Sequence, residues 1–231
     1  MYDIRLIAWL FAFAVCFVGS LAKAEEALGD PESERYSELE KEKSSFRDSW
    51  VLPGADFSQY SKIYIWDAVF EYRDVGSPSR YPSSISRSSR TLFAVPEEAR
   101  AEFEQLVGDA FRKALKKGKN FELVDSLGPD TLILRGGLLD IISKVPPETV
   151  GRTNVYLSNI GEATMVIEVL DGDSGTVLAM LSERRRIDSP GGGQIDSFST
   201  PANRVTISSD IRRWAANAAT RLRKELDEAM N

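Results

Sequence analysis

Runs in which apolar residues alternate with polar ones, or fill both faces, predict the strands of this chain. The first run covers 62–72 and is apolar on both faces, so we expect it to lie centrally in a sheet. Further strands are predicted at 121–124, 131–145, 162–170 and 176–187. A hairpin turn, 171–175, joins the last two. Gly136 and Gly137, inside the strand 131–145, indicate a bulge or a close approach of two backbones.

Two segments carry apolar residues at the spacing of three and four that is typical of an amphipathic helix. The first covers 96–117, with Glu97 and Glu98 in its first turn and lysines in its last turn, as the helix dipole favours. The second covers about 203–229. Two helices are too few for a doubly wound parallel sheet. We therefore expect an α+β fold: a single largely antiparallel or mixed sheet of four to five strands, with two long helices packed on one face.

The amino terminus has the three parts of a signal peptide. Arg5 provides positive charge, 6–18 is an unbroken apolar run, and Ala22 and Ala24 are small residues at the positions that a signal peptidase reads. The apolar run has 13 residues, fewer than the roughly 20 that span a bilayer. We predict that 1–24 is cleaved after Ala24, that the protein is periplasmic, and that no transmembrane segment remains.

Cys16 raises the alternative of an outer-membrane lipoprotein, in which lipid is attached to a cysteine at the cleavage site. The residue before that cysteine should be small, and Val15 is not. Lipidation at Cys16 would also place the new amino terminus inside the apolar run. We therefore favour cleavage after Ala24 and keep the lipoprotein as the alternative.

The exported part is expected to consist of a charged tether and one domain. Residues 25–49 are highly charged with few large apolar side chains, which favours a flexible tether. Residues 50–231 form the single α+β domain. Within it, 73–90 is rich in serine and arginine and cannot bury enough apolar surface to order itself, so we expect a long mobile loop there.

Composition excludes several classes of function. The chain has 231 residues and a formal net charge of -6, which argues against a nucleic-acid partner. It contains no histidine, and this excludes Ser-His and Cys-His catalysis and the commonest metal ligand. Its one cysteine permits neither an intramolecular disulfide nor a thiolate zinc cluster. We predict no catalytic residue, no metal site and no cofactor.

Three polar residues stand out as candidates for a functional or structural site. Asp140 lies between Leu138-Leu139 and Ile141-Ile142 in a predicted strand, where a carboxylate is either functional or held by structural partners. Arg184 and Arg186 share one face of the last strand and could bind an anionic head group or a glycan. Structural pairing is the simpler interpretation for all three: Asp140 with backbone or arginine partners, and the two arginines with acidic neighbours.

The turn 171–175 superficially suggests calcium, because two aspartates alternate with glycine and serine. An EF-hand loop needs an oxygen ligand at its fifth position and glutamate at its twelfth, and here these positions are Gly175 and Ser182. A hairpin turn explains the same residues without a metal.

Four short motifs follow one another along the domain: 52–57 with Tyr60 and the strand 63–65, 128–132 running into 138–141, 161–164 leading to Glu168 and the turn 170–175, and Trp214-Ala215 with Leu222 and 226–227. In this order and spacing they resemble the bacterial envelope family catalogued as domain of unknown function 3313. The resemblance covers roughly residue 50 to the carboxyl terminus. It implies a cell-envelope protein with no established activity and carries over no catalytic residue.

Members of that family often look like lipoproteins, and this chain departs from them by its Ala22-Lys23-Ala24 cleavage site. We expect an exported, non-catalytic interaction or binding module whose partner is another envelope protein or an outer-membrane assembly. The alternative is a carboxylate-dependent enzyme acting on an envelope component, which would need two acidic groups roughly 5–9 Å apart in a cleft.

Overall fold

The computed structural model describes residues 35–75, 92–146, 156–188, 200–201 and 203–231. The predicted signal peptide with Cys16, and nearly all of the predicted loop 73–90, lie outside these residues. No helix in the described ranges is both long and apolar enough to cross a membrane.

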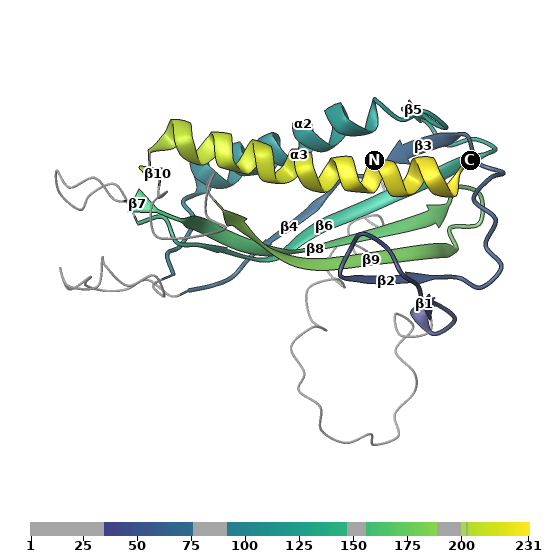
Figure 1. Cartoon of the computed structure of the whole chain (residues 1–231), viewed down its shortest axis with the longest axis horizontal. Helices are drawn as coiled ribbons and strands as arrows, with labels where there is room; N and C mark the ends of the chain where they lie inside the picture. The colour runs from purple at the N-terminus through teal and green to yellow at the C-terminus, as the bar shows by residue number, and fades with distance from the viewer. Residues whose placement is uncertain (1–34, 76–91, 147–155, 189–199, 202) are drawn as a thin grey trace, which may run out of the picture.

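A mixed sheet of eight strands forms one layer of the molecule (Figure 1). Seven strands follow one another in the order β1-β2-β9-β8-β6-β3-β5, and β4 also pairs with β6. Their bounds are β1 Glu40–Lys41, β2 Asp48–Val51, β3 Lys62–Ile65, β4 Val69–Tyr72, β5 Glu122–Val124, β6 Thr131–Ser143, β8 Asn159–Asp171 and β9 Val177–Asp188. Two further strands, β7 Tyr156–Leu157 and β10 Thr200–Pro201, form a separate antiparallel pair.

Strand directions divide the sheet into two parts. From β1 through β2, β9 and β8 to β6, each strand is antiparallel to the next one in the sheet order. β3 is parallel to both β5 and β6, and β4 is parallel to β6. Helix α2, Glu97–Leu115, lies between β4 and β5 in the chain. It returns the chain to the end of the sheet at which β3 begins, so that β5 can run parallel to β3.

Both helices cover the same face of the sheet (Figure 1). Helix α2 packs beside α3, Arg204–Ala229, which begins with a capping box between Asn203 and Thr206. Ala215, Ala218 and Leu222 of α3 are almost completely buried and let the helix lie close to the strands. The predicted α+β class and the two long helices are confirmed.

The number of strands differs from our expectation of four to five. The short strands β1, β2 and β5 have two to four residues each, too few to show a period of two in the sequence. The predicted strand 62–72 is also divided into β3 and β4. β3 has a neighbour on each side but is next to last in the sheet order rather than central. β4 pairs with β6 alone among the described strands, and Trp66 between β3 and β4 is 49% exposed.

The segment assigned to a tether also differs where the structure describes it, from residue 35 on. β1 and β2 pair with each other, and β2 pairs with β9. Phe46 is buried in the main core, and Tyr36 and Leu39 pack on a second, smaller apolar cluster. A few well-placed aromatic side chains therefore hold this charged segment on the domain.

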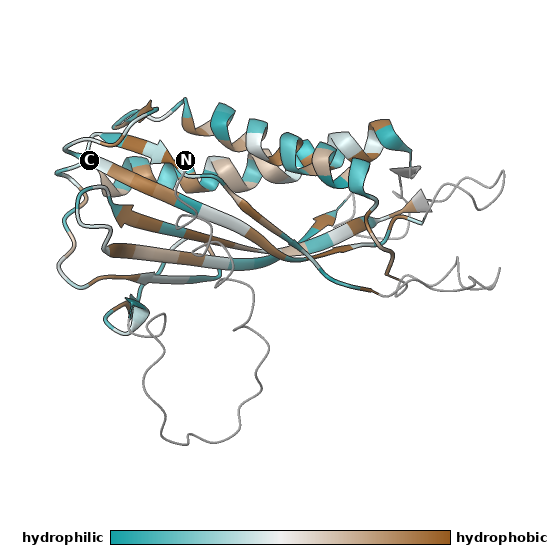
Figure 2. Ribbon diagram, turned by 180° about the vertical axis from the view of Figure 1, so that it is seen from behind, coloured by the Kyte–Doolittle hydropathy of each residue, from teal (hydrophilic) through white to brown (hydrophobic). Residues whose placement is uncertain are grey.

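Figure 2 shows that hydrophobic residues recur along the strands, while the helices alternate hydrophobic and hydrophilic positions. The main core lies between sheet and helices and includes Phe103, Leu132, Met165, Trp214 and Leu222. The bulge expected at Gly136-Gly137 is instead at Asp140. A Cβ atom at Gly137 would nevertheless lie 3.3 Å from the carbonyl oxygen of Val69, so the expected close approach of two backbones is present.

Candidate functional site

One face of the sheet carries no helix. The side chains of β8 that point to this face are less buried, over part of the strand, than those that point to the helices. Ala163, Met165 and Ile167 face the helices and are buried. Their neighbours Thr164 and Val166 point to the opposite face and are only partly buried. We call the surface formed by the outward residues of β4, β6, β8 and β9 the helix-free face, because both helices lie on the other side of the sheet (Figure 1).

A bulge in β6 brings Asp140 onto this face. Leu139 pairs with Thr164 and Ile142 with Glu162, so β6 spends one more residue than β8 between the two pairs. Asp140 takes up the difference with a φ of 53°. Aspartate tolerates this left-handed conformation better than most residues, because its short side chain can bond locally.

Two arginines converge on the Asp140 carboxylate. The Arg73 guanidinium donates from Nε to Oδ1 at 2.6 Å and from Nη2 to Oδ2. Arg184 of β9 donates from Nη1 to Oδ2 at 2.6 Å and to the Thr164 hydroxyl at 3.1 Å. Nη2 of Arg184 also lies 3.2 Å from Glu162. We call Arg73, Asp140, Glu162, Thr164 and Arg184 the bulge cluster.

The bulge cluster is balanced in charge and half open to solvent. The side chains of Arg73, Asp140 and Arg184 are 42%, 37% and 34% exposed. The hydrogen bond from Arg73 is the main reason that the pKa of Asp140 lies below its usual value, partial desolvation opposes it, and the bond from Arg184 adds to it. Asp140 is therefore an anion at neutral pH that orients two cations, and it has no proton to donate.

Two of the three predicted residues thus meet, and the third does not. Arg186 is on the same strand face as Arg184, but it pairs with Asp188 at 3.3 Å at an exposed position. Sequence reasoning missed Arg73, which it assigned to the first position of the mobile loop. The sequence signal that could have placed Arg73 beside the sheet is the predicted strand that ends at Tyr72, the residue before it. The N–H of Arg73 still bonds the carbonyl of Ile141, which places its side chain beside the bulge.

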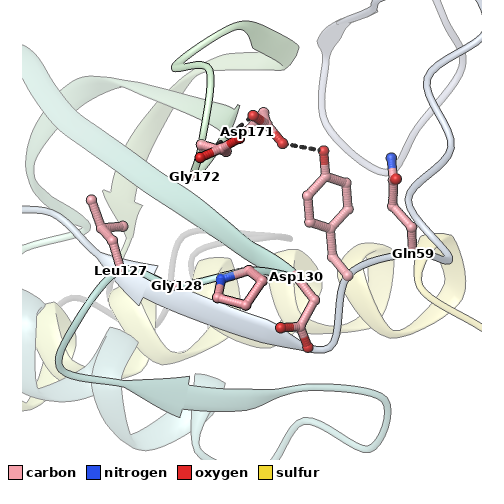
Figure 3. Close-up of a pocket in the computed structure, with 9 residues that line it drawn as sticks. Gln59, Leu127, Gly128, Asp130, Asp171 and Gly172 are labelled. Atoms are coloured by element: carbon pink, nitrogen blue, oxygen red, sulfur yellow. Dashed lines mark hydrogen bonds between the residues drawn. The ribbon is translucent and has the colours of Figure 1, made fainter.

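A depression of about 500 Å³ lies at another place, next to the hairpin between β8 and β9 (Figure 3). Its walls include Tyr60, Asp130, Asp171 and Asp173. The Tyr60 hydroxyl donates to the Asp171 carboxylate at 2.6 Å, and Figure 3 draws this hydrogen bond as a dashed line at Asp171. This depression is the place where the alternative of a carboxylate enzyme must be tested.

The Asp171 and Asp130 carboxylates in this depression have structural partners. Asp171 accepts hydrogen bonds from Tyr60 and from the backbone and side chain of Ser174, which lower its pKa to about 2. Asp130 accepts from Ser61 and from Lys62 at 2.9 Å, and these bonds also hold its pKa below the usual value. A general acid needs the opposite shift. Asp171 stabilises the hairpin turn, as the sequence predicted, by accepting hydrogen bonds from the backbone of Asp173 and Ser174.

A third polar group lies beneath the amino-terminal segment. Glu168 of β8 is 3% exposed and accepts hydrogen bonds from the Tyr36 hydroxyl and from Nε of Arg135. Burial, followed by the bond to Glu168, raises the pKa of Tyr36 to about 12. The contact joins the amino-terminal segment to the helix-free face. Within the described ranges, no group of three or more acidic or cysteine side chains is arranged to hold a metal ion.

One family model matches most of the chain. The model described as protein of unknown function (DUF3313) matches residues 23–222, and the chain belongs to this family. The match begins before residue 50, in agreement with the packing of residues 36–51 on the sheet. No curated protein matches the chain significantly.

Solved structures resemble the chain only distantly. The PelC dodecamer from Paraburkholderia phytofirmans is 10% identical, with a TM-score of 0.32 over 74% of this chain and 92% of that one. Protein XCC0632 from Xanthomonas campestris, of family DUF330, is 10% identical, with a TM-score of 0.39 over 77% and 89% of the two chains. The hypothetical protein CT253 from Chlamydia trachomatis is 10% identical, with a TM-score of 0.31 over 70% and 98%.

Proposed function

We propose that this member of the DUF3313 family is an exported, non-catalytic interaction module of the bacterial cell envelope. Its partner is another envelope protein or an outer-membrane assembly, and it binds through the helix-free face of the sheet. The observation that carries the proposal is the burial pattern of β8 over residues 162–167, where the side chains toward the helices are buried and Glu162, Thr164 and Val166 on the other face are only partly buried. The signal sequence supports export.

The outward residues of the helix-free face suit recognition of a protein. Val166 of β8 and Met180 of β9 provide partly buried apolar side chains, and the bulge cluster provides charged groups fixed by their own hydrogen bonds. Arginine held in a planar, bidentate pair loses little entropy when a partner adds a further bond. A rigid surface of this kind binds with less ordering cost than a flexible one.

The depression beside Tyr60 is the observation that favours the second candidate, a carboxylate-dependent enzyme. Against it, every carboxyl group with a resolved pKa shift among the described residues is shifted downward. Hydrolysis of a glycosidic bond by two carboxylates needs one that is protonated at the working pH. The carboxylates of Asp130 and Asp171 already have structural hydrogen-bond partners in the depression. We therefore prefer a binding module to an enzyme.

Site-specific photo-crosslinking in the intact envelope tests the proposal. A photoreactive amino acid at Val166 samples the helix-free face, and one at Lys113 samples the exposed side of α2 as the matched control. We expect a discrete crosslinked envelope protein from Val166 and none from Lys113. Equal crosslinking from both positions, or none from Val166, would contradict the proposed binding face.

A further inference from the structure

The outer edge of β4 is unpaired in the described part of the chain. β4 pairs with β6 on one side, and β5 continues the sheet from β3 only. The N–H of Arg73 points inward, to the carbonyl of Ile141. Because backbone groups alternate in direction along a strand, those of Phe70 and Tyr72 point outward, away from β6.

This edge is longer than the other edges of the sheet and has apolar side chains at its surface. β4 has four residues, against two in β1 and three in β5. Trp66 and Val69 are 49% and 41% exposed, and they are two of the four large apolar residues that the described chain exposes. Tyr64 packs against Trp66 edge to face, with ring centroids 6.1 Å apart, and holds the indole in place.

Natural proteins protect such edges, because an unpaired strand recruits another one. Charge is the usual protection, and here it is acidic: Asp67 and Glu71 are exposed on either side of Val69. An antiparallel pair of two β4 copies with Phe70 opposite Tyr72 would place Glu71 of one copy opposite Glu71 of the other. Like charges that face each other destabilise a strand pair. The edge therefore disfavours a second copy of the chain.

We infer that the edge of β4 binds an extended peptide segment of a partner, which adds a strand to the sheet. Main-chain hydrogen bonds to Phe70 and Tyr72 provide affinity, and side chains on alternate positions provide selection. On the helix-free side, the segment presents an apolar residue to Trp66 and Val69 and a basic residue to Glu71. The inference rests on the proposed function only in treating the chain as a binding module.

A synthetic peptide of about eight residues provides the probe. Threonine occupies every second position, and valine and lysine occupy the others in turn, so that one face carries valine and lysine. Titration into the isotope-labelled protein is followed by the amide resonances of Phe70 and Tyr72 and by their hydrogen exchange. We expect both amides to shift and to exchange more slowly in the complex. No binding of this peptide would overturn the inference.

N-methylation separates strand addition from nonspecific adhesion. A peptide N-methylated on one set of alternate residues cannot donate to β4, whereas methylation of the other set faces solvent. We expect one of these two peptides to bind about tenfold more weakly, or worse, and the other to bind like the parent. Any other pattern contradicts strand addition.

Charge reversal tests selection. Glu71→Lys should weaken binding of the lysine peptide by about tenfold and favour its glutamate counterpart. Glu122→Lys, an exposed position on β5, is the matched control and should change neither affinity. Equal effects of the two substitutions defeat the selection argument. If the peptides fail while Val166 still crosslinks a partner, the edge inference falls and the proposed function stands.

Discussion

Asp140 combines an unusual backbone conformation with hydrogen bonds to two arginines on the helix-free face. Its left-handed φ of 53° creates the bulge, and the bulge turns its carboxylate toward Arg73 and Arg184. These arginines come from the end of β4 and from β9, on opposite sides of β6 and β8. A single carboxylate thus links strands across the helix-free face, which favours a structural role.

Replacing Asp140 by alanine should destabilise the protein by about 1–3 kcal/mol. Both arginines lose their shared acceptor, and alanine tolerates the left-handed conformation less well than aspartate. Asp140→Asn is the matched control: it suits the same φ and keeps an acceptor oxygen, so a smaller loss is expected. Urea unfolding measures both. An unchanged or higher midpoint for the alanine variant, at an unchanged slope, would show that the carboxylate is held at a cost and make Asp140 the first residue to test for ligand binding.

The Tyr60–Asp171 pair should limit stability at both ends of the pH range. The folded pKa of Asp171 is lowered to about 2, so its contribution is complete above the unfolded pKa and is lost as the pH falls from about 4 to 2. The folded pKa of Tyr60 is raised to about 12, so its contribution is complete below about pH 10 and is lost as the pH rises toward 12.

Tyr60→Phe removes the bond and should flatten both limbs of the curve of unfolding free energy against pH. Chemical unfolding at intervals from acid to alkaline pH measures the effect. Tyr64→Phe, in the neighbouring strand β3, serves as the control. If the two variants show the same pH dependence as the parent protein, the pair makes no contribution to folding.

At the scale of elements, two glycines illustrate different demands. Gly108 lies inside α2, and a Cβ atom there would meet nothing within 4 Å. Gly172 follows β8, and a Cβ atom there would lie 2.3 Å from the carbonyl oxygen of Thr131, to which its own N–H donates at 2.9 Å. The helix tolerates a side chain at Gly108, whereas the end of the β6–β8 ladder excludes one at Gly172.

Replacing each of these glycines by alanine should therefore change the stability of the protein in opposite directions. Gly108→Ala should stabilise the protein by about 0.5–1 kcal/mol, because alanine loses less backbone entropy in a helix. Gly172→Ala should destabilise it by about 1–3 kcal/mol, because the backbone must move. Thermal and urea unfolding of the two variants provide the measurement. A loss at Gly108 or a gain at Gly172 would show that the packing around that glycine differs from the one described.

At the scale of the whole molecule, the amino-terminal segment is part of the domain. Tyr36 reaches Glu168 near the carboxyl end of β8, and Leu39 packs with Ile133 and Val177 on the helix-free face. These contacts leave the other end of that face, around the bulge cluster, free of this segment. The chain that follows the predicted export signal therefore begins its fold on the same face that we propose for binding.

Tyr36→Phe should cost about 1–3 kcal/mol, because Glu168 stays buried with one donor fewer. The matched control is again Tyr64→Phe, which lies in the same apolar cluster. Urea unfolding gives the free energy, and limited proteolysis near residue 36 reports whether the segment detaches. Equal stability of the Tyr36 variant and the parent protein would show that the hydroxyl bond contributes nothing to docking.

Export should produce a protein that begins at Glu25. The reason is the Ala22-Lys23-Ala24 motif after a short apolar run. Intact-mass measurement of the protein recovered from the envelope checks the cleavage site. A diacylated species that starts at Cys16 would contradict it and establish an outer-membrane anchor instead.

The sequence by itself determined the elements with strong local patterns. Helices α2 and α3 show a period of 3.6 over many turns, and the long strands β6, β8 and β9 are marked by apolar residues and turn signals. The α+β class and the unusual position of Asp140 followed from these features, and the family resemblance followed from four short motifs. Local patterns reveal them because each is set by neighbours within a few residues along the chain.

Tertiary structure alone decided the rest. Strands of two to four residues, such as β1, β2 and β5, exist because an already formed sheet offers them a partner. The meeting of Arg73 with Asp140 and Arg184 depends on strand register and on a bulge of one residue, and both are set by pairing between distant segments. The exposed edge of β4 likewise follows from sheet order, because no property of a four-residue sequence specifies which strand lies beside it.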